Sequence, residues 1–294
     1  MRYFDMHCDT LSRCADEGKS IYDNDLQISL KRLNDFDYAV QFFAAYINTY
    51  KYDGEAGYKR FLQQLEIFKT AADYANNAPN VHLVLTVESL SALGGKIERI
   101  GELKGYGVKV ASLNWNGYNG IAGGMDSDEG ISDFGREVVR ELERNDIIID
   151  VSHLNDRSFF ELCDIITKPI VATHSNSRSY CANPRNLTDE QLKIIFESGG
   201  VVGLNIYDAV LGERLDGFDD LLRHIDNMYK AGGEGHVALG SDFDGCDTDE
   251  RFNNVSDMPR FYDYIAAHLS QADADGIFYD NAARFFDGIV CRAF

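Results

Sequence analysis

The sequence predicts a single α/β domain that spans residues 1–294 and folds as a (β/α)8 TIM barrel. Short runs rich in β-branched and aromatic residues alternate with longer segments of helical periodicity along the whole chain. Several of the short runs are almost continuously apolar, which is typical of parallel strands buried on both faces. The chain has only 4 prolines and no Pro/Gly/Ser-rich linker, so nothing marks a domain boundary.

Eight runs are predicted to be strands. They are RYFDMH (2–7), YAVQFFAAY (38–46), VHLVLTV (81–87), VKVASLN (108–114), IIIDVS (147–152), PIVATH (169–174), GVVGLNI (200–206) and HVALGSD (236–242). A doubly wound open sheet is the alternative architecture. It is disfavoured because no G-x-G-x-x-G motif follows the first strand.

Helical periodicity fills most of the intervals between these runs. The predicted helices are 58–75, 132–145, 187–198, 217–233 and 259–271. Ser132 and Thr188 are predicted N-caps, because their hydroxyl groups can accept the unpaired N–H groups of a first helical turn. Strands joined by such crossover helices form a parallel sheet.

Composition excludes several classes of partner. The formal net charge is −20 and the sequence pI is about 4.6, so the chain should repel nucleic-acid phosphates and anionic membranes. No apolar run approaches the ~20 residues of a membrane span, and the N-terminus has no apolar leader. The 6 cysteines are scattered without a C-x-x-C motif. We therefore expect free thiols and a cytoplasmic protein.

Polar side chains gather where the predicted strands end. His7 and Asp9 close the first run, and Glu88 follows the third. His153 follows the fifth run, while the sixth and eighth end in His174 and Asp242. Because a barrel places its active site at the carboxyl ends of its strands, these side chains should converge. The other four histidines lie at strand starts or on helices, where we expect no catalysis.

The converging residue types indicate a metal site. Imidazole and carboxylate ligands suit Zn²⁺, and also Mn²⁺, Co²⁺ or Fe²⁺. His7 and Asp9 are two residues apart on a predicted strand, so both should point into the barrel mouth. Cys8 should then point into the packing, and Asp5 should lie deeper, outside the ligand set. The alternative is that this stretch is merely a polar N-terminal edge.

The set is larger than one tetrahedral zinc ion requires. A carboxylate can bridge two metal ions ~3.5–4 Å apart, and two-metal sites activate water for hydrolysis. Asp242 is then a candidate general base or acid. Its alternative role is structural, as a cap of the following loop.

In these motifs the chain resembles the membrane (renal) dipeptidase family, the M19-type metallopeptidases of the amidohydrolase-like barrels. The resemblance runs nearly end to end. It rests on DMHCDT (5–10), VES (87–89), DVSHLND (150–156), ATHSNSR (172–178), CANPRN (181–186), GSDFDG (240–245) and DNAARFF (280–286). Each motif alone is weak, but all occur in order and in register with the predicted strands.

The resemblance implies a binuclear zinc site on a barrel of the metal-dependent hydrolase type. His7 and Asp9 would bind one zinc ion, His153 and His174 the other, and Glu88 would bridge them. A hydroxide held between the metals would attack a dipeptide, and Asp242 would carry its proton to the leaving amine.

Two further residues match substrate contacts of the family. Arg185 matches the arginine that holds the substrate's terminal carboxylate, although a solvated surface arginine is the alternative. Tyr207 matches a pocket tyrosine, although a tyrosine at a strand end is also common in packing.

One position departs from the family pattern. Mammalian members carry a substrate-contacting histidine after the fourth strand, whereas here Trp115 or Asn114 stands in that place. Tryptophan cannot accept a proton, so it could only wall the pocket or donate through its indole N–H. We therefore expect this chain to share the metal chemistry of the family but to differ from the mammalian members in the substrates that its pocket prefers.

The expected function is therefore a zinc dipeptidase that cleaves Xaa-Xaa dipeptides, with a D-residue tolerated at the C-terminal side. The alternatives are a barrel hydrolase acting on a lactone, cyclic amide or N-acyl amino acid, and a binding protein on a degenerate barrel. Arg185 discriminates between the enzymes, because a lactonase has less need of a carboxylate clamp. A homodimer is compatible with the sequence, which does not specify the oligomeric state.

Overall fold

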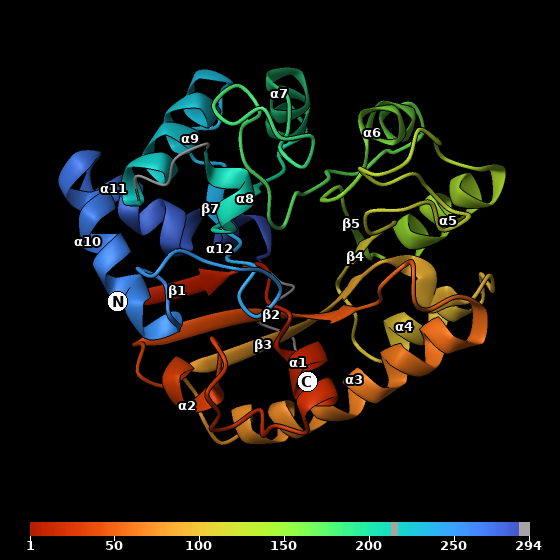
Figure 1. The fold of residues 1–294 in the computed structure, drawn as a ribbon, viewed down its shortest axis with the longest axis horizontal. Helices are drawn as coiled ribbons and strands as arrows, with labels where there is room; N and C mark the ends of the chain where they lie inside the picture. Colours follow the sequence, from red (N-terminus) through yellow and green to blue (C-terminus); the bar gives the residue numbers. More distant parts are fainter. Residues whose placement is uncertain (213–216, 288–294) are drawn as a thin grey trace.

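A seven-stranded parallel sheet forms the centre of the computed structural model, which describes residues 1–212 and 217–287. The strands follow the order β5-β4-β3-β2-β1-β7-β6. Their bounds are β1 Arg2–Asp5, β2 Tyr38–Tyr46, β3 Val81–Glu88, β4 Val110–Ser112, β5 Ile148–Asp150, β6 Val202–Leu204 and β7 Val237–Leu239. The sheet is curled, and the helices lie around its outside (Figure 1).

The predicted strand at 169–174 is not a regular strand in the structure. Val171 forms a single parallel bridge with Asp150 of β5, and Ala172 forms one with Val202 of β6. This two-residue segment therefore lies between the two edge strands of the sheet. The prediction of eight full strands is corrected to seven strands and this bridged segment, which is too short for a repeating ladder.

The five predicted helices correspond to the helices Gly54–Ala75, Asp133–Arg144, Asp189–Glu197, Phe218–Lys230 and Met258–His268, and the remaining helices were not predicted. Ser132 and Thr188 cap α5 and α7 as predicted, and Thr188 forms a full capping box with Gln191. The α-helices are α1 Thr10–Glu17, α2 Leu30–Leu33, α3 Gly54–Ala75, α4 Arg99–Gly105, α5 Asp133–Arg144, α6 Asp156–Cys163, α7 Asp189–Glu197, α8 Asp208–Leu211, α9 Phe218–Lys230, α10 Met258–His268, α11 Gln271–Asp275 and α12 Asn281–Phe285.

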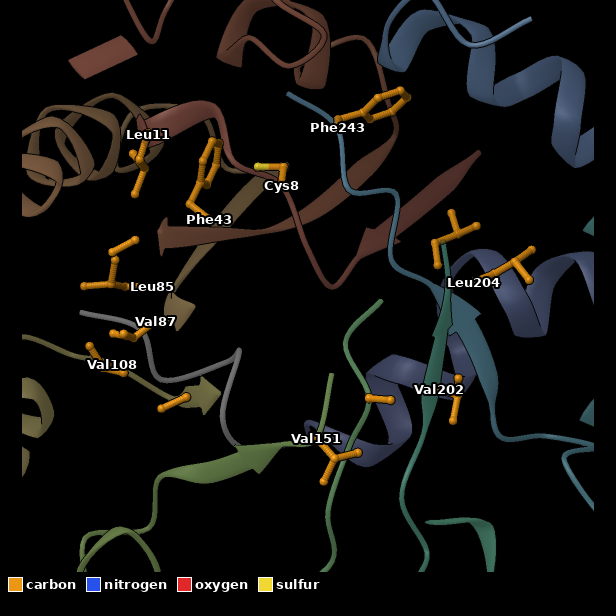
Figure 2. Packing of buried hydrophobic residues seen from close by; sticks show 14 of the residues in the cluster. Cys8, Leu11, Phe43, Leu85, Val87, Val108, Val151, Val202, Leu204 and Phe243 are labelled. Carbon is orange, nitrogen blue, oxygen red and sulfur yellow. The ribbon is translucent and has the colours of Figure 1, made fainter. Parts of the chain in front are cut away.

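Alternating strand residues supply two hydrophobic clusters. Phe42 of β2 belongs to a smaller cluster that also contains Phe4 of β1 and Phe286, which follows α12. Phe43 belongs to the larger cluster between the sheet and the helices. Figure 2 shows part of this larger cluster, with Cys8 near Phe43 and Phe243. Cys8 is fully buried, so the prediction that it points into packing is confirmed.

His224, one of the histidines expected to be non-catalytic, is buried on α9. Its Nε2 atom lies 2.9 Å from the Leu211 carbonyl oxygen, and its Nδ1 atom accepts the Ser177 N–H at 3.2 Å. Burial lowers the pKa of His224 to about 4. The folded protein therefore holds a neutral imidazole, which both donates and accepts.

This imidazole should make the protein sensitive to acid. Between pH 6.5 and about 4, His224 is protonated in the unfolded chain but remains neutral in the folded protein. Stability from this residue is thus complete above pH 6.5 and falls as the pH drops, by about 3 kcal/mol in total. His224→Gln keeps a donor and an acceptor but cannot titrate. Urea unfolding at pH 7 and pH 4.5 should show a smaller loss in the variant, and equal losses would contradict this assignment.

Among the described residues, no helix combines the length and apolar character that a membrane crossing requires. No disulfide is formed by the five cysteines in the described ranges, Cys8, Cys14, Cys163, Cys181 and Cys246. Cys291, the sixth, lies outside the described residues.

Candidate metal centre and active site

The six residues predicted to form the metal site and its acid–base group lie at or just beyond the carboxyl ends of the strands, with one correction of detail. β1 ends at Asp5, so His7 and Asp9 lie in the following loop and not on the strand itself. They still meet, because the chain turns into α1 at Asp9, and His7 Nε2 lies 3.3 Å from Asp9 Oδ2. Asp5 remains below them, buried, and accepts hydrogen bonds from the backbone N–H groups of His7 and Ser241.

Glu88, the last residue of β3, lies at the centre of the cluster. Its Oε1 atom is 2.8 Å from His153 Nε2 and 3.6 Å from His174 Nε2. Its Oε2 atom is 3.7 Å from His7 Nε2. The potential ligand atoms of the described residues form three compact groups within 4.8 Å of one another: His7, Asp9 and Glu88; Glu88, His153 and His174; and His7, His174 and Asp242. Glu88 belongs to the first two and offers one oxygen towards His7 and the other towards His153, so it occupies the position of a bridge.

Hydrogen bonds behind the histidines fix their orientation. His153 Nδ1 lies 2.8 Å from Asn116 Oδ1, which can only accept, so this nitrogen carries the proton,. His174 Nδ1 lies 2.8 Å from the hydroxyl oxygen of Thr173, which donates to Asp150 Oδ2 at 2.6 Å. Both histidines therefore direct an unprotonated Nε2 atom at Glu88. Such hydrogen bonds to the far ring nitrogen are typical of metal-binding histidines.

The donor atoms of the cluster fit a cation. The Nε2 atoms of His153 and His174 lie 3.0 Å apart. Burial lowers the pKa of each well below its usual value, so two lone pairs face each other beside a carboxylate oxygen. Asp9 Oδ1 is buried without a hydrogen-bond partner among the described residues. Positive ions held by these two sets of atoms would satisfy the facing lone pairs and the unpaired oxygen.

The negative charge around His7 also favours a bound cation. Burial lowers the pKa of His7, but the charges of Glu88, Asp9 and Asp242 outweigh burial and raise it to about 10. The same negative potential attracts a metal cation, which would compete with the proton for Nε2. The residues present therefore fit metal dependence.

Asp242 lies at the rim of this cluster with one oxygen turned towards it. Its Oδ1 atom is 3.9 Å from His7 Nε2, and its Oδ2 atom accepts the Asn205 side-chain amide at 3.1 Å. Burial raises the pKa of Asp242 to about 6. Its backbone adopts a left-handed conformation with φ 62°, as does that of His153 with φ 72°. Non-glycine residues keep such conformations where the surrounding structure fixes them.

A cavity of about 590 Å³ opens over the cluster. Asp9, Glu88, His153 and Asp242 contribute to its wall together with Arg185, while His7 and His174 lie behind them. This volume is in the range of small-molecule sites. The cavity therefore gives a small ligand direct access to the cluster.

Arg185 is a buried residue of this cavity and not a surface arginine. Its guanidinium donates to Ser175 Oγ at 3.1 Å and to the His174 carbonyl oxygen at 3.0 Å. These bonds fix the group and leave further N–H groups for a ligand. The position suits a carboxylate clamp.

The structure distinguishes Asn114 from Trp115, the two residues that could stand in place of the family histidine. Asn114 is fully buried and donates to the Gly117 and Ala122 carbonyl oxygens, so it is a structural residue of the loop. Trp115 lines the cavity, as does Tyr207 on the other side of the cluster. The residues that orient the histidines, Asn116, Thr173 and Asp150, were not predicted to belong to the site. Asn116 directly follows Trp115 in the sequence, but its hydrogen bond to His153 is visible only in the folded protein.

A family model described as membrane dipeptidase, peptidase family M19, matches residues 1–290. Among curated relatives, an uncharacterised protein in the pqqA 5′ region of Klebsiella pneumoniae is 34% identical over 223 residues, which cover 70% of this chain and 82% of the relative. An uncharacterised dipeptidase of Schizosaccharomyces pombe is 28% identical over 69% of this chain and only 50% of its own length.

A solved structure agrees over the whole chain. A metallopeptidase from Rhodobacter sphaeroides, liganded with a phosphinate mimic of the dipeptide L-Ala-D-Ala, superposes with a TM-score of 0.86. It is 25% identical, and the match covers 100% of this chain and 99% of that one.

Proposed function

This chain belongs to the membrane dipeptidase family, peptidase family M19, a family of metal-dependent peptide-bond hydrolases, and we propose that it is a zinc-dependent dipeptidase. The observation that carries the proposal is Glu88, whose two oxygens face different histidines in two adjoining ligand groups. This arrangement suits two metal ions better than one.

The chain's own residues suggest how the ions would be held. His7 and Asp9 would hold one zinc ion, His153 and His174 the other, and Glu88 both. Mn²⁺ or Co²⁺ could substitute, because the donor set of imidazole and carboxylate also suits them. When bound, two zinc ions would supply an activated water nucleophile and polarise the scissile carbonyl.

Asp242 would move the proton. Its Oδ1 atom faces the cluster, while Asn205 holds Oδ2. As a carboxylate it would accept a proton from the attacking water and then donate it to the leaving amine. Burial raises the pKa of Asp242 to about 6, which brings it nearer to neutral pH and makes it a better acid–base group than an exposed aspartate,.

Arg185 would hold the terminal carboxylate of the substrate. A guanidinium can pair with both oxygens of a carboxylate, and the cavity leaves it accessible,. The dipeptide mimic bound to the Rhodobacter sphaeroides metallopeptidase carries a D-residue at its C-terminal side. We therefore propose that this chain accepts L-D as well as L-L dipeptides. The free thiols support the further proposal of a cytoplasmic location,.

The function is tested by turnover of a panel of L-L and L-D dipeptides by the metal-loaded protein, with and without a chelator. We expect hydrolysis that the chelator abolishes and zinc restores, together with two bound zinc ions in metal analysis. Absence of turnover with every dipeptide, while a lactone or N-acyl amino acid is cleaved, would contradict the proposal.

Arg185→Ala should raise KM for dipeptides about 10-fold or more and change kcat less. The reason is that the clamp holds substrate and transition state alike. Arg185→Lys keeps the charge but loses the forked guanidinium, so its KM should lie between those of the wild type and Arg185→Ala. Arg157→Ala, at an exposed arginine of α6, is the matched control. An unchanged KM in Arg185→Ala would show that the carboxylate is held elsewhere.

A further inference from the structure

The cavity wall opposite Arg185 consists of neutral residues. Tyr46 ends β2 and Trp115 follows β4, so they flank Glu88 at the end of β3. Met125 and Asn116 complete this side, and Asn116 is already bonded to His153. Further charged side chains that line the cavity, Arg13, Asp16, Asp244 and Asp247, come from the segments after β1 and β7. The side formed by Tyr46, Trp115 and Met125 is therefore an apolar wall.

This apolar wall is held rigidly. The indole ring of Trp115 meets Tyr46 edge-on at 5.2 Å and Tyr50 at 5.7 Å between ring centroids. The Trp115 backbone N–H donates to Asn114 Oδ1 at 2.7 Å. The Met125 backbone N–H donates to the His153 carbonyl oxygen at 3.0 Å, which ties the wall to the metal-binding cluster. A preformed wall binds an apolar side chain without the cost of ordering its own residues.

The direction of the substrate follows from the sheet order. Arg185 contacts His174, which follows the bridged segment between β5 and β6, and Tyr207 follows β6. Tyr46 and Trp115 lie beyond the other side of the metal-binding cluster, after β2 and β4. A dipeptide with its carboxylate on Arg185 and its scissile carbonyl over the cluster must direct its N-terminal residue to the apolar wall.

We propose that Tyr46, Trp115 and Met125 form the pocket for the side chain of the substrate's N-terminal residue, and that this pocket selects large apolar and aromatic residues. The inference rests on the proposed dipeptidase function, because it takes Arg185 as the carboxylate clamp. Trp115 is then a specificity-determining residue: its ring replaces a polar contact by a flat apolar surface. Selection arises because a side chain on this surface leaves water on binding, whereas a glycine leaves the surface exposed.

Two series of dipeptides test the proposal. The first varies the N-terminal residue (Gly-Ala, Ala-Ala, Leu-Ala, Phe-Ala) and the second varies the C-terminal residue (Ala-Gly, Ala-Leu, Ala-Phe), all with L-residues. In the wild type, kcat/KM for Phe-Ala should exceed that for Gly-Ala by about tenfold or more. Trp115→Ala should reduce this ratio about tenfold, because kcat/KM should fall more for Phe-Ala than for Gly-Ala, with zinc content retained. Met125→Ala should reduce it in the same direction by less.

The matched control is Tyr118→Ala, which removes an exposed aromatic ring of the same loop outside the cavity and should leave the ratio unchanged. A wild-type ratio near one, or an unchanged ratio in both Trp115→Ala and Met125→Ala, overturns the inference while dipeptidase activity stands. A larger effect of Trp115→Ala on the second series than on the first means that the substrate lies in the reverse direction, which also overturns it. Absence of turnover for all dipeptides overturns the proposed function itself.

Discussion

Asp242→Asn is expected to lower kcat by about 10²–10⁴ while the metal content of the protein stays unchanged, because the amide has the same shape as the carboxylate but cannot accept the proton. The amide oxygen can still accept the Asn205 N–H that now bonds Oδ2 at 3.1 Å, so the local structure should be retained. The measurements are steady-state kinetics on a dipeptide and zinc content by metal analysis.

Metal content is the decisive control, because Asp242 also lies within ligand distance of His7 and His174. If Asp242→Asn loses zinc together with activity, Asp242 is a metal ligand and the assignment as a base is wrong. Retained kcat would remove Asp242 from the mechanism altogether. Asp226→Asn makes the same change of charge at an exposed position of α9 and should leave both readouts unchanged.

The pH profile should report the same group. A base must be deprotonated to act, so activity is present above its pKa and is lost as the pH falls through it. Burial raises the pKa of Asp242 to about 6, and a nearby cation would lower it again,. The acid limb of the kcat profile should therefore lie at or below pH 6, and Asp242→Asn should lose this limb from its residual activity.

Position along the chain was enough to predict which residues meet. The carboxyl ends of parallel strands share one rim, so Glu88, His153 and Asp242 could be grouped from the strand pattern alone. The predicted strand bounds were wrong in two places, because the sequence pattern does not specify strand length. β1 stops at Asp5, and His7 reaches Asp9 through a turn that no periodicity indicates. The sixth predicted strand is reduced to bridges at Val171 and Ala172 for the same reason.

The supporting hydrogen bonds could not be predicted, because they join residues that are distant in sequence. Asn116 orients His153 across 37 positions, and Asp150 holds Thr173, which orients His174, across 23. A buried threonine or aspartate near a strand end has many uses, so its residue type alone carries no prediction. The choice between Asn114 and Trp115 likewise required the backbone of the loop, which turns Asn114 inwards and Trp115 into the cavity.

Glu88→Gln should lower dipeptide turnover at least as much as Asp242→Asn does. The reason is that Glu88 belongs to two of the ligand groups. The amide keeps one oxygen but loses the negative charge and can no longer present two equivalent acceptors, 2.8 Å from His153 and 3.7 Å from His7,. The amount of bound zinc should fall by half or more, and dipeptide turnover should fall about 10³-fold or more, because a ligand of the proposed zinc site is lost.

The metal-free protein offers an independent readout of the same substitution. Against the effect of burial, the Glu88 charge is the largest contribution that raises the pKa of His7 to about 10. In chelator-treated Glu88→Gln, the pKa of His7 measured by NMR titration should therefore fall, since less negative charge remains to stabilise the imidazolium. The control is Glu17→Gln, which removes a half-exposed carboxylate at the end of α1. If Glu88→Gln binds two zinc ions with wild-type affinity and leaves the His7 titration unchanged, Glu88 does not bridge the site, and the case for two metal ions loses its main support.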